Sequence, residues 1–263
     1  MNRPFLFAAQ LALTLLVAAF LVVPVLMSML AGVTVNFFQG ISSGLTLRWV
    51  WRVLDLYADT LALSLGLALA CLACALVLGV PAAYALAKRP SRLTRLIEEM
   101  LVVPVAVPGL ATALALLIAY GGFREFRTSA AFILVGHVLF TLPFMIRAVL
   151  AVLSSIDLKT LEEGARSLGA SFPQRFFGVI LPNCRSGILA GSLMVVTLSI
   201  GEFNLTWMLH TPLTKTLPVG LADSYASMRL EIGSAYTLIF FILILPLLLA
   251  MQALSRPRRR KET

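Results

Sequence analysis

The chain has 263 residues, of which 60% are hydrophobic and only 13% are charged. Soluble globular proteins are about a quarter charged, so this composition excludes an ordinary soluble protein and predicts an all-α membrane protein. The formal net charge is +9, but the Lys and Arg residues flank apolar runs and form no basic soluble domain. Nucleic acid is therefore not an expected partner, whereas membrane lipid is.

Six apolar runs follow one another along the chain, each long enough to cross a bilayer as a helix. They are predicted at about residues 5–31, 60–87, 100–120, 128–153, 186–209 and 232–255, within one transmembrane domain over residues 1–263. The first run is too long for the apolar core of a signal peptide, which predicts a retained span. Pro104 and Pro108 mark the entry to the third run, where a proline deeper in the helix would kink it.

The basic residues predict how the chain is oriented. Six spans place both termini on one side of the membrane, together with the connections at 88–99 and 157–182. That side carries fourteen of the 21 Lys and Arg residues, including five at 256–261, and the other side carries six. The remaining one, Arg147, lies near the end of the fourth run. Because positive charge marks the cytoplasmic side, both termini are predicted to be cytoplasmic, and the basic tail is predicted to anchor this topology.

Residues 157–182, called the hairpin below, form the long polar interruption in the second half of the chain. Its first part carries an apolar stripe with helical spacing, made of Leu158, Leu161, Ala165 and Leu168. Gly169 suits a helix end, and Ser171 with Pro173 can start a second short helix. The apolar side of that helix is made of Phe172, Phe176, Phe177 and Ile180. The residues alone leave two interpretations open: an amphipathic segment at the bilayer surface, or a hairpin whose apolar stripe docks on a partner.

Local signals predict how the first helix of the hairpin is stabilised. Asp157 is a predicted N-cap, and Thr160 with Glu163 fits a capping box one turn later. Glu162 and Arg166 have the spacing and order of a favourable i,i+4 ion pair on the polar face.

The sequence lacks the common motifs for nucleotide binding, catalysis and metal binding. It contains no Gly-Lys dipeptide and hence no P-loop, so a transport process would need energy from a partner. Cys71 and Cys74 have a C-x-x-C spacing, but they lie in an apolar run, which favours core packing. Residues 40–44 match the pattern G-x-S-x-G without its strand–turn–helix context, which favours a chance match. No catalytic residue, metal ligand or cofactor is predicted for this chain.

Polar residues inside the apolar runs are costly and suggest a transport pathway. Glu202 in the fifth run is the clearest case, with Asn204 and Trp207 close behind it, and its charge suits a cationic or amine-bearing substrate. The alternative for Glu202 is a carboxylate near the outer interface with water or Arg as partner. His137 in the fourth run is a further pathway candidate, although a hydrogen bond between helices suits it better than a ligand site.

The hairpin resembles the EAA signature of ABC importer permeases. The matching residues are Glu163-Gly164-Ala165, Gly169 and Leu181-Pro182 at the family's spacing, with Gly164 in place of Ala and Val179 in place of Ile. The resemblance extends over roughly residues 55–255. It includes the segments LVVPVAVPGL at 101–110, LPF at 142–144 and TLPVGL at 216–221.

The resemblance implies a type I ABC importer permease of the bacterial inner membrane, in which the hairpin fits a groove on a separate ATPase subunit. The residues implied to couple to that subunit are Glu162, Glu163, Gly164, Ala165, Leu168, Gly169, Leu181 and Pro182. ATP would be bound by the ATPase partner. The other implied partners are an extracytoplasmic substrate-binding protein and a second permease subunit, either a different chain or a copy of this one.

The resemblance is greatest to permeases for polyamines, 2-aminoethylphosphonate, iron and sulfate, and the expected substrate is 2-aminoethylphosphonate or a polyamine. The alternative is a secondary transporter driven by an ion gradient, which would be expected to show intramembrane carboxylates and repeated, broken helices. A membrane scaffold or intramembrane enzyme is a third possibility, against which the missing catalytic constellation argues.

Overall fold

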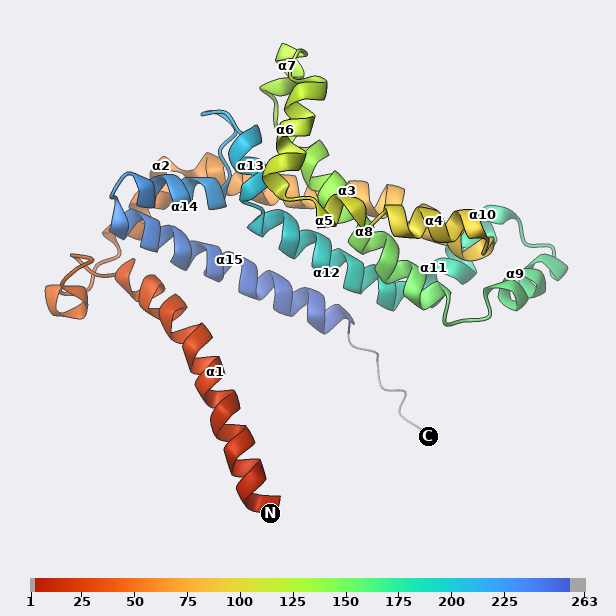
Figure 1. Ribbon diagram of the computed structural model, residues 1–263, viewed down its shortest axis with the longest axis horizontal. Helices are drawn as coiled ribbons and strands as arrows, with labels where there is room; N and C mark the ends of the chain where they lie inside the picture. Colours follow the sequence, from red (N-terminus) through yellow and green to blue (C-terminus); the bar gives the residue numbers. More distant parts are fainter. Residues whose placement is uncertain (1–2, 256–263) are drawn as a thin grey trace. The chain divides into compact units, whose positions relative to one another are not determined.

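The computed structural model describes residues 3–255, and the basic tail at 256–261 lies outside the described residues. Within that part of the chain the elements are helices, and the sole extended pairing is an isolated bridge between Thr34 and Leu45. The predicted all-α fold class is confirmed (Figure 1).

Among the described residues, four helices are long and apolar enough to cross a membrane. They are α1 (Arg3–Ala31), α3 (Ala58–Lys88), α8 (Ala130–Leu153) and α15 (Leu230–Ser255). Two bent pairs of helical segments raise the number to six if each pair is one span. The six predicted runs therefore correspond to four uninterrupted helices and two interrupted ones.

The third run is interrupted near its start. The helices α4 (Arg92–Met100) and α5 (Val103–Ala106) precede a bend of 99° into α6 (Gly109–Tyr120). Val107 is extended, with φ −80° and ψ 131°, because the ring of the following Pro108 disfavours a helical residue before it. This is the kink expected of a proline that lies inside a helical run.

The fifth run is interrupted near its end. The helix α12 (Arg185–Gly201) stops at Glu202, whose backbone is extended, and the short α13 (Asn204–Leu209) begins two residues later. At the other end, α12 follows the bent segment α10 (Phe172–Arg175), η2 (Phe176–Ile180) and α11 (Leu181–Asn183), with a bend of 72°. The break at Glu202 separates the pathway candidates Asn204 and Trp207 from the main body of the span.

The polar connections also contain short helices. They are η1 (Gly40–Ser43), α2 (Arg48–Leu56), α7 (Arg124–Arg127), α9 (Leu158–Ser167) and α14 (Leu217–Ala226).

The chain divides into two compact units. One comprises residues 1–58 and 220–243. Within it, the carboxylate of Glu231 accepts a hydrogen bond of 3.0 Å from the Phe37 backbone N–H, and Arg229 donates one of 2.9 Å to the Tyr57 hydroxyl. These contacts tie the first polar connection to the start of α15.

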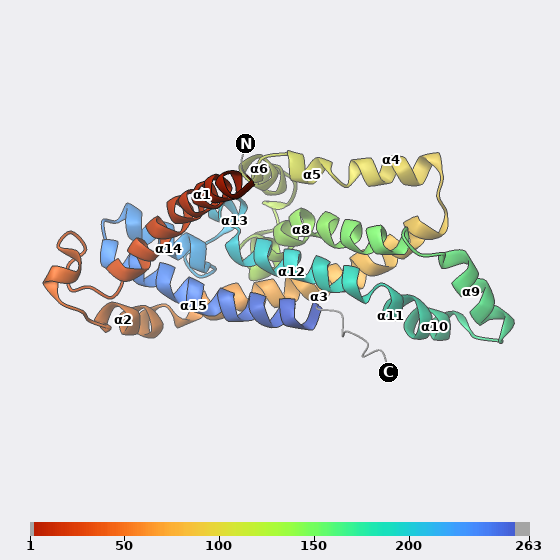
Figure 2. The same ribbon diagram turned by 90° about the horizontal axis from the view of Figure 1, so that it is seen from below.

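The other unit comprises residues 59–219 and 244–263 and contains all the residues of the hairpin. Within it, α8 and α12 lie side by side (Figures 1 and 2). The approach is close because Gly187 on α12 has no side chain: a Cβ atom there would lie 2.6 Å from the Ala148 carbonyl oxygen. The core of this unit extends from α3, α8 and α12 into the hairpin, where it buries Leu158 and Ile180.

Candidate functional site

The first helix of the hairpin, α9, starts at an acidic cap. The Asp157 carboxylate accepts hydrogen bonds of 3.1 Å from the Thr160 backbone N–H and 2.6 Å from the Thr160 hydroxyl, and both lower the pKa of Asp157. The predicted N-cap is confirmed. The predicted capping box of Thr160 with Glu163 does not form, because the helix already begins at Leu158 and Thr160 is its third residue.

The turn of the hairpin depends on Gly169. Its φ is +82°, in the left-handed region where a side chain is strained although the space around it is open. Ser171 then caps α10 in a capping box with Gln174, and Pro173 lies in the first turn. The predicted turn and the predicted start of the second helix are both confirmed.

The apolar stripe of α9 is buried at its first residue and exposed at its last. Leu158 is only 8% exposed and belongs to the core, and Leu161 and Ala165 are half-buried. Leu168 is the exception, with 90% of its side chain exposed. Leu158 therefore anchors the hairpin in the core, because the unit has apolar side chains there to cover it, whereas docking of Leu161, Ala165 and Leu168 on a partner stays a prediction.

A different set of residues forms the outer face of the hairpin. Its exposed members are Glu163, Gly164, Leu168, Gly169, Phe172 and Phe177. Farther along, Leu181 is half-buried and Pro182 is exposed at the approach to α12. The sequence pattern placed Phe172 and Phe177 on one apolar side with Ile180, but only Ile180 is fully buried.

Glu162 turns away from this outer face. Its carboxylate lies 2.9 Å from the Lys88 ammonium and also accepts a hydrogen bond from the Tyr84 hydroxyl. Burial alone would raise the pKa of Glu162, but the hydrogen bonds from Tyr84 and Lys88 outweigh it and lower this pKa. The predicted partner of Glu162 was Arg166, and the structure gives it Lys88 instead. On the exposed side of α9, Lys159 and Glu163 approach to 3.9 Å.

Tyr84 and Lys88 are residues that sequence reasoning missed. They precede Glu162 by 78 and 74 positions, and periodicity along a chain carries no signal for such a distant pairing. The available clue was Lys88, the first charge after a long apolar run.

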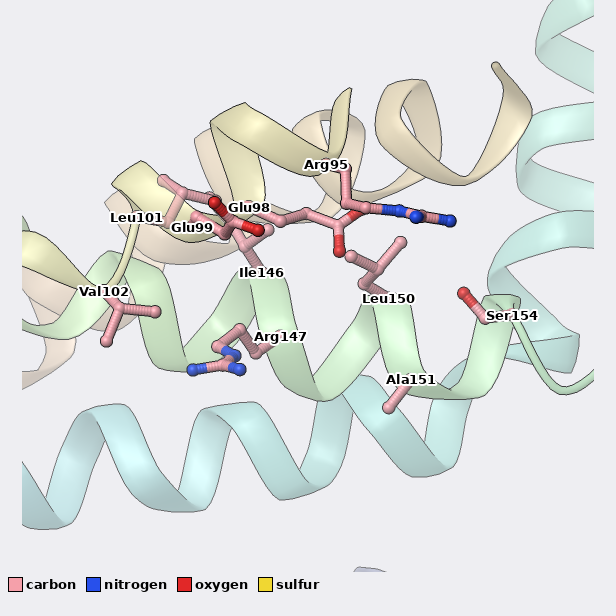
Figure 3. Close-up of a pocket in the computed structure, with 10 residues that line it drawn as sticks. All are labelled: Arg95, Glu98, Glu99, Leu101, Val102, Ile146, Arg147, Leu150, Ala151 and Ser154. Atoms are coloured by element: carbon pink, nitrogen blue, oxygen red, sulfur yellow. The ribbon is translucent and has the colours of Figure 1, made fainter. Parts of the chain in front are cut away.

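Besides a cavity of about 450 Å³ at the start of α4, two further cavities lie near this end of the unit. One, of about 690 Å³, is lined by Lys88, Glu162, Arg166 and Arg175 among others. The other, of about 430 Å³, lies between α4 and α8 (Figure 3). Its charged lining residues are Arg95, Glu98 and Glu99 of α4 and Arg147 of α8.

Three of the four charged residues of the amphipathic helix α4 line this cavity. Its exposed apolar side chains are Leu93, Leu96, Ile97 and Met100. For a helix in a bilayer this arrangement suits lipid on the outside and water in the cavity.

Glu202 serves as a cap at the helix break. Its carboxylate accepts a hydrogen bond of 2.6 Å from the Leu205 backbone N–H at the start of α13. Glu202 is half-buried, whereas Asn204 and Trp207 are exposed beside it. Gly109 at the start of α6 packs here, because a Cβ atom on it would lie 3.4 Å from the Glu202 carboxylate. The two interrupted helices of this unit therefore meet at their breaks.

His137 makes the hydrogen bonds between helices that were predicted for it. Its ring nitrogens lie 2.9 Å from the Ser199 hydroxyl and 2.8 Å from the Thr206 hydroxyl, and 1% of its surface is exposed. It thus links α8 to both sides of the break between α12 and α13. In the part of the chain that the structure describes, no cluster of His, Cys, Asp and Glu could hold a metal ion.

The sequence matches proteins that transport several kinds of solute. A spermidine/putrescine transport system permease protein, PotB, of Escherichia coli is 36% identical over 170 residues, 58% of this chain and 61% of that protein. The molybdenum transport system permease protein ModB of Haemophilus influenzae is 30% identical over 76% of this chain and 93% of its own length. The putative 2-aminoethylphosphonate transport system permease protein PhnV of Salmonella typhimurium is 25% identical over 95% of this chain and 94% of that protein.

The fold matches a solved structure over almost the whole chain. It is a bacterial ABC transporter involved in the import of the acidic polysaccharide alginate, with a TM-score of 0.74 and 15% identity over 98% of this chain and 97% of that chain. The family model of binding-protein-dependent transport system inner membrane components matches residues 75–261. The chain therefore belongs to this family, the inner membrane permeases of ABC transporters, as the EAA-like residues of its hairpin indicated.

Proposed function

We propose that this chain is the permease subunit of an ABC importer that moves a small polar solute by alternating access. An extracytoplasmic binding protein delivers the solute, and ATP at a separate ATPase subunit drives the cycle. The observation that carries this proposal is the outer face of the hairpin. Glu163, Gly164, Leu168 and Gly169 are exposed there on a segment whose opposite side is anchored in the core.

The outer face has the chemistry of a docking surface. Leu168 is an apolar side chain exposed at the end of a charged helix, where burial by a partner would be favourable. Gly164 leaves the helix surface bare next to it, so that a partner can approach closely. Glu163 can pair with a cation of the ATPase subunit. The roles we propose for Gly169 and for Leu181-Pro182 are to set the turn and to join the hairpin to α12.

The orientation that we propose places both termini, the connection at 88–99 and the hairpin on the cytoplasmic side of the membrane. The distribution of Lys and Arg supports it, because this side carries fourteen of them against six on the other. Reporter fusions at each terminus and in the connection at 210–216 test the orientation. Activity of an extracytoplasmic reporter at either terminus would contradict it.

The meeting point of the two helix breaks is the proposed site on the solute pathway. Interrupted membrane helices offer backbone groups and polar side chains at depths where continuous helices cannot. Asn204 and Trp207 are exposed there, and Glu202 supplies a carboxylate whose charge suits an amine. His137 contacts Ser199 and Thr206 on the two sides of the break and so stabilises it. A second permease subunit, a different chain or a copy, would complete the pathway.

The proposed substrate is an amine-bearing solute, 2-aminoethylphosphonate or a polyamine. Glu202 and the similarity to PotB and PhnV support this choice, whereas the similarity to ModB points to an oxyanion. Binding assays on the partner binding protein with putrescine, 2-aminoethylphosphonate and molybdate separate these classes. Tight binding of molybdate alone would overturn the amine.

Purification in mild detergent tests the proposed function most directly. The wild-type chain is expected to carry an ATPase subunit with it, and Leu168→Asp is expected to release that subunit because a charge replaces the exposed apolar contact. Leu213→Asp is the matched control, since Leu213 is equally exposed but lies far along the chain from the hairpin. Equal retention by all three proteins would contradict docking at the outer face.

A further inference from the structure

The last turn of α3 is joined to the hairpin by a compact polar cluster. Tyr84 and Lys88 lie one helical turn apart, and both contact the Glu162 carboxylate on α9. The Lys88 ammonium donates a second hydrogen bond of 2.7 Å to the Tyr84 hydroxyl, which closes the cluster. Each of the three polar groups therefore contacts the other two.

Tyr84 also contacts the second arm of the hairpin. Its ring lies 5.5 Å from that of Phe176 and 6.2 Å from that of Phe172, measured between centroids, and it is only 7% exposed. Phe172 and Phe176 are stacked on each other at 5.8 Å. A single residue of α3 is thus held by α9 through its hydroxyl and by α10 and η2 through its ring.

No covalent route leads directly from α3 to the hairpin, because α4 to α8 lie between them in the chain. A movement of the hairpin reaches α8 and α12 through the backbone at either end, but it reaches α3 only through side chains. The apolar contacts of the core are non-directional and allow sliding. Hydrogen bonds depend on angle as well as distance, so the cluster fixes the position of α9 against α3.

We propose that Tyr84, Lys88 and Glu162 form a joint that makes α3 move together with the hairpin when the ATPase subunit pulls on it. The inference rests on the proposed function and assigns Glu162 to force transmission inside this chain, while Glu163 on the outer face contacts the partner. The three are positioning residues, and none of them needs to touch solute or ATP.

The different roles of Glu162 and Glu163 follow from how exposed each side chain is. The Glu162 side chain is 13% exposed and paired, whereas the Glu163 side chain is 65% exposed. An ATPase subunit can reach Glu163 without any rearrangement. It could reach Glu162 only after the cluster had opened.

The test uses spin labels at Ala85→Cys on α3 and Ser167→Cys on α9, both exposed positions, in the permease assembled with its ATPase subunits. Trapping with ATP and vanadate is the probe of the label distance, which needs no solute, and uptake per ATP is measured with putrescine. In the wild-type background the distance between the labels is expected to stay narrow and unchanged on trapping. In Glu162→Gln it is expected to broaden and shift, with ATP hydrolysis retained and solute uptake per ATP reduced.

Glu163→Gln is the matched variant, because it removes the same charge one residue away. It is expected to weaken co-purification of the ATPase subunit and to leave the distance between labels on the free chain unchanged. Tyr84→Phe keeps the ring contacts and the Lys88–Glu162 ion pair but removes both hydrogen bonds of the hydroxyl, so an intermediate broadening is expected. The double exchange Lys88→Glu with Glu162→Lys is expected to restore part of the narrow distribution that each single exchange loses.

Two results would overturn the joint. One is an unchanged label distance and unchanged uptake per ATP in Glu162→Gln. The other is loss of the ATPase subunit in Glu162→Gln as large as in Glu163→Gln, which would make Glu162 a partner contact. Failure of the proposed function would look different, since no ATPase subunit would then purify with the wild type. In that case the label distance in the free chain would still be expected to broaden in Glu162→Gln, and an unchanged distance would refute the cluster.

Discussion

The outer face of the hairpin and the break between α12 and α13 each carry a conspicuous glutamate, and the two glutamates have opposite surroundings. Glu163 is exposed, with Lys159 at 3.9 Å as its ion-pair contact. Glu202 is half-buried and caps α13 through the Leu205 backbone N–H. An exposed charge on a well-anchored segment is available to a partner, whereas a half-buried charge first has to satisfy the backbone around it.

The comparison is sharpened by the residues behind each glutamate. Behind the hairpin lies the cluster of Tyr84, Lys88 and Glu162, which includes an ion pair at 2.9 Å. On the inner side of the break lies His137, whose imidazole ring bridges the hydroxyls of Ser199 and Thr206. Charged pairing thus occurs at the polar end of α3, and hydroxyl–imidazole pairing occurs inside the spans, where unpaired charge is far more costly.

The largest expected effect is loss of uptake in Gly169→Asp. The left-handed backbone there costs about 1–2 kcal/mol for a residue with a side chain, and the new charge would lie beside Leu168 on the outer face. Uptake into cells is expected to be abolished while membrane insertion, measured by immunoblot of membranes, is unchanged. Gly178→Ala is the matched control, because Gly178 is exposed in the same hairpin with an ordinary φ. Normal uptake in Gly169→Asp would remove the hairpin from coupling.

The next effect concerns stability at the break. His137→Ala leaves the buried Ser199 and Thr206 hydroxyls without their imidazole partner, at a cost of about 1–3 kcal/mol for each group. The thermal unfolding temperature in detergent is expected to fall clearly. His210→Ala is the control, since His210 is half-buried and contacts the carbonyl oxygen and the ring of the nearby Trp207. An equal decrease of the unfolding temperature in the two variants would show that the hydrogen bonds of His137 do not stabilise the break.

A smaller effect is expected of Glu202→Gln. The amide oxygen of Gln can still accept the hydrogen bond from the Leu205 N–H, so the cap and the unfolding temperature should persist. Loss of the charge is expected to reduce putrescine uptake about tenfold, which corresponds to about 1.4 kcal/mol. Unchanged uptake would take Glu202 out of the pathway. A large loss of stability would show instead that the carboxylate itself is required for folding.

The smallest effect is the dependence of the hairpin on pH. Because the folded chain lowers the pKa of Glu162, its contribution is complete above the ordinary pKa of a glutamate and is lost as the pH falls through the lowered value. Protection of the hairpin from proteolysis should therefore be constant at neutral pH and decrease only in acid. The contribution is below about 1 kcal/mol, because Lys88 is partly exposed. Glu162→Gln should abolish this acid-side decrease, and an unaltered profile would assign it to another group.

The sequence predicted the local features of the hairpin well and its orientation only in part. Asp157 as a cap and Gly169 as the turn depend on neighbouring residues, so their signals are contained in a few positions. The burial of Leu158 and the exposure of Leu168 belong to the same stripe and could not be separated by periodicity. Which end of a stripe is covered depends on the elements that pack against it.

The helix breaks show a similar limit. Pro108 was predicted at the entry to a helix and instead follows a kink, whereas Pro81 and Pro143 lie inside α3 and α8 without ending them. The sequence pattern also ran through Glu202 without interruption, whereas the structure ends α12 there. A proline or a glutamate breaks a helix only where neighbouring groups can satisfy the freed backbone, and Gly109 marks where the two breaks meet.

The sequence by itself determined the membrane class, the all-α fold and the EAA-like hairpin. The reason is that the length of an apolar run, its flanking charges and the spacing of a motif each depend on residues close together in the chain. Only the tertiary structure decided that Glu162 faces Tyr84 and Lys88 while Glu163 faces outward. Adjacent residues on a helix point in directions about 100° apart. Which of the two becomes an internal contact therefore depends on where α3 ends, and α3 lies more than seventy residues away along the chain.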